Sequence, residues 1–355
     1  MRKGLRDIGY RPGRLPTGER NSITDVPGVR VGHSTISDGD RQTGVTAILP
    51  RPGDMFREKL PAAYHVINGF GKTTGLIQIR ELGVLETPIL LTNTLSVGTV
   101  WDALARYMLK DNPDIGRETG TVNPVVCECN DGYLNDIRGF HVTPSMVYES
   151  LESADDDFKC GAVGAGRGMS CYELKGGIGT ASRTIRAAGE SFVVGALLLT
   201  NFGSLEDLVF LGRPLGFELS RDIQPRAGDP GSVITILATN APLSSRQLGR
   251  LTRRAVAGLS RTGSAMASGS GEIVLAFSTA YTVPHYAPSG VLELRLLHED
   301  CMDSLFRAAV ESVEEAVLDS LWSAETTRGR DGHVRYGVRE LAAAKELTLA
   351  GDRPT

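Results

Sequence analysis

Apolar residues along the chain follow two spacings, one typical of buried strands and one typical of helices. Short runs rich in β-branched residues predict strands at 45–49, 89–92, 191–199, 233–239, 273–277 and 291–297. Between them, apolar residues recur at steps of three and four, which predicts helices. Strands and helices alternate without a change in composition, so we expect one α/β domain over residues 1–355, with helices covering one or more sheets in a layered sandwich.

Three segments carry the helical spacing. The first lies behind Ser96, a good N-cap residue, and the second behind Ser244 and Ser245. The third is the longest, and we expect its interleaved acidic residues to form a solvated face. The three apolar stripes are Val97, Val100, Trp101, Leu104, Ala105 and Met108; Leu248, Leu251, Ala255 and Leu259; and Leu305, Ala309, Val313, Ala316, Val317 and Leu321, the last with Glu311, Glu314, Glu315 and Asp319 between them. Residues 342–355 read as a short helix and a tail.

Composition narrows the class of protein. Of the 355 residues, 41% are hydrophobic and 23% charged, with a net charge of −4 and both signs interspersed, which is typical of a soluble globular protein. No basic surface for nucleic acid is indicated, and no apolar stretch is long enough for a membrane span. The five cysteines lack the spacing of a disulfide framework, which favours a reducing compartment and therefore the cytoplasm. Cys127 and Cys129 are expected to pack in the core.

The step Gly231-Ser232 is the strongest candidate for chemistry. It separates a loop of turn residues, 224–230, from the predicted strand 233–239, so Ser232 would stand at the start of that strand. Ser270-Gly271-Glu272 opens the strand 273–277 in the same way. Two such strand starts could bring a carboxylate and a second hydroxyl to the first serine, as an activated nucleophile requires. The alternative is that both serines are ordinary turn residues.

The remaining candidate motifs, for nucleotide binding, a nucleophile elbow and histidine-based chemistry, each lack a required residue or spacing. The stretch 69–75 resembles a phosphate loop, but Val66 stands where the first glycine belongs. The stretch 164–169 starts like a dinucleotide fingerprint, but Met169 replaces its third glycine. No serine lies in a nucleophile elbow. The six histidines have neither metal-ligand nor triad spacing, and no cofactor or metal is expected; they are His33, His65, His141, His285, His298 and His333.

A serine nucleophile without histidine still needs a base. If the chain is cut after Gly231, the new α-amine of Ser232 can serve, because such an amine titrates at about 7.7–8.0. Cleavage would then create the catalyst, with fragments 1–231 and 232–355.

Several stretches together resemble the L-aminopeptidase/D-esterase family, the DmpA-like enzymes that include the β-aminopeptidases. They are 21–33, 88–98, 130–139, 161–183, 197–203, 231–232, 238–243 and 270–272. The resemblance implies an αββα sandwich and self-cleavage before Ser232, the nucleophile. It places Ser270 and Glu272 beside that residue, Asn201 near the oxyanion, and Tyr133 as the candidate for the family's active-site tyrosine. Asn240 stands where the family is expected to have an aspartate, and Asn93 reads equally well as a structural residue.

We therefore expect a self-processing serine aminopeptidase that hydrolyses amides or esters of short substrates with a free amino end. Two alternatives stay open: an acyltransferase that passes the acyl group to an amine, and a non-catalytic binding protein on the same fold. The resemblance further suggests a homo-oligomer. Preference among L-, D- and β-amino acids does not follow from the sequence.

Overall fold

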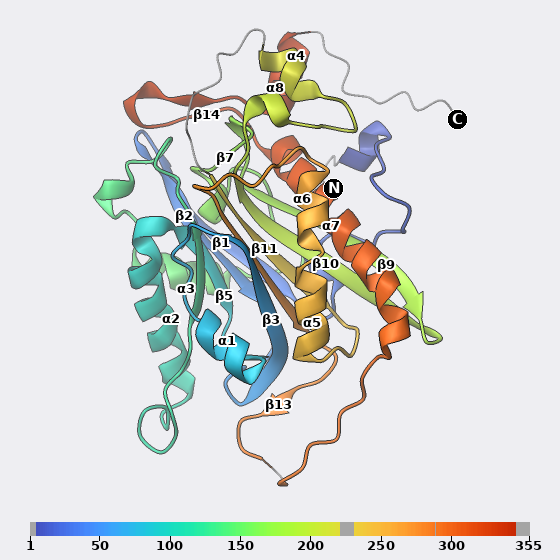
Figure 1. The fold of residues 1–355 in the computed structure, drawn as a ribbon. Helices are drawn as coiled ribbons and strands as arrows, with labels where there is room; N and C mark the ends of the chain where they lie inside the picture. The colour runs from blue at the N-terminus through green and yellow to red at the C-terminus, as the bar shows by residue number, and fades with distance from the viewer. Residues whose placement is uncertain (1–4, 221–230, 288, 346–355) are drawn as a thin grey trace.

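The computed structural model describes residues 5–220, 231–287 and 289–345, and the loop 224–230 lies outside them. Within these ranges the chain forms a sandwich of two sheets with helices on both outer faces (Figure 1). The first sheet has the order β1-β2-β5-β6. Its strands are β1 (Arg30–Asp38), β2 (Arg41–Leu49), β5 (Ile89–Asn93) and β6 (Val125–Cys129); β5 and β6 are parallel and the other neighbours antiparallel.

The second sheet is the larger and carries the order β13-β3-β12-β11-β10-β9 among the described residues, with β4 paired to β3. Its strands are β13 (Val283–Pro284), β3 (Glu58–Gly69), β12 (Gly271–Ser278), β11 (Ser232–Thr239), β10 (Glu190–Asn201), β9 (Ile178–Ala187) and β4 (Val84–Leu85). The central strands β11 and β12 run parallel, so both begin at the same end of the sandwich.

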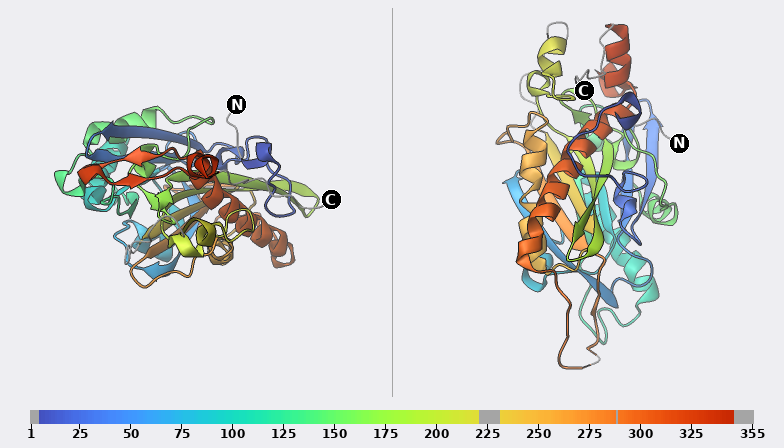
Figure 2. Two further views of the ribbon diagram at one scale, coloured as in Figure 1. Left: turned by 90° about the horizontal axis from the view of Figure 1, so that it is seen from above. Right: turned by 90° about the vertical axis from the view of Figure 1, so that its right-hand side faces the viewer.

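The outer layers are helical, which gives the expected αββα order. Helices α2 (Val97–Asp111) and α3 (Pro144–Glu152) cover the first sheet, and α5 (Ser245–Thr252), α6 (Ala255–Ser260) and α7 (Met302–Ser323) cover the second. The stripe behind Ser244 is thus divided between two consecutive helices, α5 and α6, and Ser244 caps the first through a capping box with Gln247. In Figure 2, α7 crosses the face of its sheet lengthwise. Helix α1 (Leu76–Leu82) lies beside β3.

Short elements gather at the end where β11 begins, at the top of Figure 1. They are α4 (Leu215–Ser220), α8 (Val338–Ala344) and two hairpins, β7 (Ser170–Cys171) with β8 (Leu174–Lys175) and β14 (Thr327–Arg328) with β15 (Val334–Arg335). Helix α8 overlaps the stretch 342–355, where a short helix was expected, only at residues 342–344, because the helix begins earlier; residues 346–355 lie outside the described part.

Period-two alternation divides the apolar side chains among three cores. In β11, Ile234 and Ile236 point between the two sheets, whereas Val233 and Leu237 point to the helices α5–α7. A third core lies between the first sheet and the helices α2 and α3. Layers approach closely at Gly179 of β9, where an added Cβ would lie 1.9 Å from the carbonyl oxygen of Ala316 in α7.

The acidic residues of α7 correct one prediction, since they do not form a solvated face. Glu311, Glu315 and Asp319 are buried, and Glu314 is half-buried. Asp319 accepts the backbone N–H of Thr180 at 3.0 Å. Glu311 and Glu315 are instead partners of Arg183, which projects from β9 with no exposed side-chain surface and needs carboxylates. Its Nε donates to Glu311 at 3.2 Å and its Nη2 to Glu315 at 2.5 Å.

The strand predicted at 291–297 is also wrong. This segment pairs with none of the described strands and so belongs to none of the described sheets. Val291, Leu292, Leu294 and Leu296 are exposed, and the segment is fastened at its end, where the backbone N–H of Leu297 donates to the oxygen of Pro242.

Candidate active site

Ser232 is the first residue of β11, as the sequence predicts, and is 6% exposed. Its neighbours in the sheet are Asn201, the last residue of β10, and Gly271, the first residue of β12. The N–H of Gly271 donates to the carbonyl oxygen of Gly231 at 3.3 Å. The carbonyl group preceding Ser232 is therefore already polarised by a backbone donor in the uncut chain.

Asn201 shares a face with Ser232, because directly paired residues of neighbouring strands point to the same side of a sheet. That side is the space between the two sheets, where the thiol of Cys129 donates to the carbonyl oxygen of Ser232 at 3.4 Å. Both ends of the Asn201 amide are held. Its Nδ2 donates to the oxygen of Asn130 at 3.0 Å, and its Oδ1 accepts the N–H of Ser170 at 2.8 Å.

Glu272 approaches Ser232 from the other side of the sheet, since it alternates with Val274 towards the helices. The side chain is 1% exposed, and neither carboxylate oxygen has a hydrogen-bond partner among the described residues. Burial raises the pKa of this carboxyl, and the nearby Ser270 hydroxyl lowers it by a smaller amount. Glu272 is paired in the sheet with Val233, the residue after Ser232, so the carboxyl and the Ser232 hydroxyl lie on opposite faces of the sheet at neighbouring positions.

Tyr133 lies half-buried in the segment that follows β6. Its ring stacks on His333 with centroids 4.5 Å apart and an interplanar angle of 3°. The guanidinium carbon of Arg335 lies 3.8 Å from the ring centroid. Tyr133 therefore packs against His333 and Arg335, just before and within β15, and no sequence pattern indicates this contact.

Two asparagines in question have structural partners. Asn93 accepts the N–H of Ser96 at 3.0 Å and donates to the hydroxyl of Thr43 at 2.9 Å. Asn240 accepts the N–H of Val193 at 2.8 Å. It follows the far end of β11, about 25 Å along the strand from Ser232, so it belongs to a different part of the molecule.

Three buried ionisable residues at this end of the sheets were missed by the sequence reasoning. Burial raises the pKa of Asp131, which has no exposed surface, to about 7. Glu128 accepts the N–H of Lys72 at 2.8 Å and the hydroxyl of Thr94. The Nζ of Lys175 donates to three backbone carbonyls, at 2.6–3.0 Å. Asp131 lies in the stretch 130–139 that carries the resemblance, which was the available signal.

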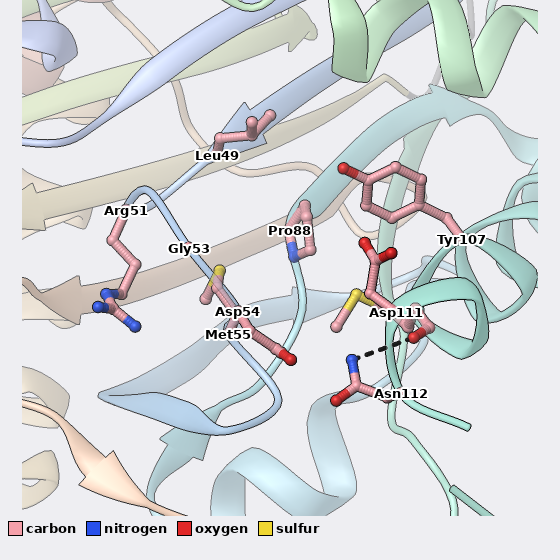
Figure 3. Close-up of a pocket in the computed structure, with 10 residues that line it drawn as sticks. Leu49, Arg51, Gly53, Asp54, Met55, Pro88, Tyr107, Asp111 and Asn112 are labelled. Carbon is pink, nitrogen blue, oxygen red and sulfur yellow. Dashed lines mark hydrogen bonds between the residues drawn. The ribbon is translucent and has the colours of Figure 1, made fainter. Parts of the chain in front are cut away.

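Other features of the described residues lie away from Ser232. A cavity of about 350 Å³ opens beside the end of α2, lined by Met55, Pro88, Tyr107 and Asn112 among others (Figure 3), and contains none of the predicted site residues. In the described ranges no group of three or more histidine, cysteine or acidic side chains has metal-site geometry, and no helix has the length and apolar character to cross a membrane. All five cysteines are free thiols, and Cys127 and Cys129 pack in the core between the sheets, as expected.

Comparison with known proteins gives consistent matches over nearly the whole chain. The model of peptidase family S58 matches residues 21–335. The β-peptidyl aminopeptidase BapA of Sphingosinicella microcystinivorans is 37% identical over 96% of this chain and 90% of its own length. A counterpart from Sphingosinicella xenopeptidilytica is 36% identical over 94% and 88%.

Solved structures agree in fold. A protein of Pyrococcus horikoshii superposes with a TM-score of 0.92 at 48% identity, covering 98% of this chain and 100% of that one. A Burkholderia β-aminopeptidase gives 0.90 at 41%, covering 99% and 100%. The L-aminopeptidase D-Ala-esterase/amidase of Ochrobactrum anthropi, described as a prototype of the serine aminopeptidases and a variant of the Ntn-hydrolase fold, gives 0.88 at 35%, covering 97% and 98%.

Proposed function

The chain belongs to peptidase family S58 and is a self-processing aminopeptidase, and we propose that Ser232 is its nucleophile, freed as an N-terminus by cleavage after Gly231. One observation carries this assignment. Ser232 has an amide donor, Asn201, on one face of the sheet, and on the other face lies Glu272, a buried carboxyl with no hydrogen-bond partner among the described residues. A nucleophile, an oxyanion donor and a counter-charge for a new amine thus converge on one residue.

Self-cleavage needs no other chain. The hydroxyl oxygen of Ser232 adds to the carbonyl carbon of Gly231, whose oxygen accepts the Gly271 N–H. The carbon–nitrogen bond then breaks, the nitrogen of Ser232 takes up the proton, and an ester joins the two residues. Water hydrolyses the ester, which releases the carboxylate of Gly231 and restores the hydroxyl. The products are fragments 1–231 and 232–355.

The new α-amine acts as the base in turnover. In its neutral form it takes the hydroxyl proton while the serine oxygen attacks the substrate carbonyl, and it returns the proton to the leaving amine or alcohol. Ser270 and Glu272 orient the amine from the helix-covered face and stabilise its protonated form. An amide nitrogen carries two hydrogens, so Nδ2 of Asn201 can hold Asn130 and still donate to the oxyanion.

The substrates we propose are short peptides, amides or esters with a free amino end, including β-amino acyl compounds of the kind named for the relatives. Glu128 places an acidic group at the same end of the sheets, where the ammonium group of such a substrate is attracted. The acyl group leaves the serine on hydrolysis by water.

We further propose that the enzyme acts in the cytoplasm as a homo-oligomer. Five free thiols fit a reducing compartment. The exposed apolar side chains of 291–296 favour burial against another copy of the chain.

Denaturing mass spectrometry tests the assignment. The wild-type protein should give two masses, for 1–231 and 232–355, and Ser232→Ala should give the mass of the whole chain and no turnover of amino-acid p-nitroanilides. Ser268→Ala, an exposed serine two residues before Ser270, is the matched control and should be cut and active. A Ser232→Ala protein that is still cut at this bond would remove Ser232 as the attacking group.

A further inference from the structure

Arg335 of β15 is a buried cation linked to two of the candidate catalytic side chains. It is 6% exposed and reaches both Ser170 and Tyr133. Building on the proposed function, we propose that Arg335 is a positioning residue for the reaction, which holds the Asn201 amide through Ser170 and holds the Tyr133 ring directly.

The first link runs through a hydrogen-bonded chain. Nε of Arg335 donates to the hydroxyl of Ser170 at 3.1 Å, and the N–H of Ser170 donates to Oδ1 of Asn201 at 2.8 Å. With its oxygen fixed there, the amide must present its nitrogen towards Asn130 and the oxyanion position. A rotated amide would place an oxygen against the oxyanion, which is repulsive. Anchoring Ser170 therefore keeps the amide in the productive orientation.

The second link is a stacked contact. The guanidinium of Arg335 lies 3.8 Å from the centroid of Tyr133, and His333, two residues earlier, stacks on the same ring. A planar cation over an aromatic ring restricts both groups, and arginine provides this contact while its Nε–H points elsewhere. One side chain therefore ties Tyr133 to the anchor of Asn201.

The two links also join the two halves of the cut enzyme. Ser170, Asn201 and Tyr133 lie in fragment 1–231, whereas Arg335 lies in fragment 232–355 with Ser232 itself. Fragment 232–355, which carries Ser232, thus also fixes the orientation of Asn201 and Tyr133 in fragment 1–231. Self-cleavage does not need these links, because the Gly231 oxygen is held by the backbone of Gly271.

The test compares Arg335→Met, Arg335→Lys and Ser170→Ala with Arg339→Met, a control that removes another arginine stacked on an aromatic ring, Trp322, in the same fragment. Mass spectrometry follows cleavage, and steady-state hydrolysis of β-alanine and L-alanine p-nitroanilides follows turnover. Arg335→Met should be cut like the wild type but should lose about 10–100-fold in kcat with KM within about twofold, because loss of a whole oxyanion donor costs about 10²–10³-fold. Ser170→Ala, which removes only a hydroxyl, should lose about threefold to tenfold.

Two further results are decisive. The fold-losses in kcat of Arg335→Met and Ser170→Ala should not multiply in the double variant, since both substitutions break the same hydrogen-bonded chain to Asn201. Arg335→Lys should recover little, because it keeps the charge but not the planar fork. Wild-type kcat in Ser170→Ala, full activity in Arg335→Lys, or a loss matched by Arg339→Met would overturn the inference. Activity that persists in Ser232→Ala would instead contradict the proposed function, so the two failures are distinct.

Discussion

Replacing Glu272 by glutamine should have opposite consequences before and after cleavage. In the uncut Ser232→Ala chain the carboxyl is buried and has no partner among the described residues, and burial raises its pKa. A raised pKa means that the folded state binds the proton more tightly than the unfolded state, so ionisation of Glu272 destabilises the fold. Glutamine has nearly the same shape without the charge, and Glu272→Gln should therefore stabilise the uncut chain.

The size of this effect follows from the burial. An unsatisfied buried polar group costs about 1–3 kcal/mol. Unfolding of a 355-residue chain carries an entropy of about 2 cal/mol/K per residue, so this energy corresponds to a rise in Tm of about 1–4 °C near neutral pH. The gain should vanish below the ordinary carboxyl pKa of 4.5, where Glu272 is protonated in both states, and grow as pH rises through the raised pKa of the folded chain.

Thermal melting of the uncut chain, with and without Glu272→Gln, measures this at pH 4 and pH 7.5. Glu81→Gln, which removes an exposed carboxyl from α1, is the control and should leave Tm unchanged. In the cut enzyme the same Glu272→Gln substitution should lower turnover about 10²–10⁴-fold, because the α-amine loses its counter-charge. A lower Tm in the uncut chain, or an equal gain at both pH values, would refute the reasoning.

Three other predictions follow from the same structure. Turnover should rise with pH through a single ionisation near 8, give or take about a unit. Replacing any one of five histidines by alanine should leave turnover intact; they are His33, His65, His141, His285 and His298. The variant His333→Ala should lower kcat without changing the pH profile, because it removes the ring that stacks on Tyr133. Loss of activity in a folded variant of any of those five would point to a histidine base. Gly179→Ala should cost about 3 kcal/mol in urea unfolding, since its Cβ would lie 1.9 Å from the Ala316 oxygen; wild-type stability would contradict this packing. Burial raises the pKa of the Cys127 thiol to about 12, so Cys127 should not react with a chromogenic thiol reagent at pH 8 until the protein unfolds. The half-buried Cys301 should react in the folded protein. Early labelling of Cys127 would show that the core opens.

Local patterns were enough to place Ser232, the proposed nucleophile, at the start of a strand. The apolar, β-rich runs 233–239 and 273–277, each preceded by a Gly-Ser or Ser-Gly step, predict two strands, and the structure has them as Ser232–Thr239 and Gly271–Ser278. The stripe behind Ser96 likewise predicts α2, because an amphipathic helix is encoded within its own residues.

Contacts between distant residues could not be predicted in this way. Arg335 and Ser170 are 165 positions apart, and Arg183 and Glu311 are 128 apart. Nothing in the local spacing of α7 distinguishes a buried acid that pairs with arginine from a solvated one. The segment 291–297 fails for the same reason, since a β-rich run becomes a strand only where a partner strand lies beside it.

If the chain is cut after Gly231 as we propose, the position of the cut within the sheet decides how the protein refolds. In the order β13-β3-β12-β11-β10-β9, β11 begins at Ser232 and β12 and β13 follow it, while β3, β10 and β9 precede it, so strands of the two fragments are interleaved in the sheet. Neither half can leave without breaking the ladders on both sides of β3 and between β11 and β10. Maturation therefore turns a unimolecular refolding reaction into an association of two chains, and the cut enzyme should regain its structure from denaturant only in a concentration-dependent manner.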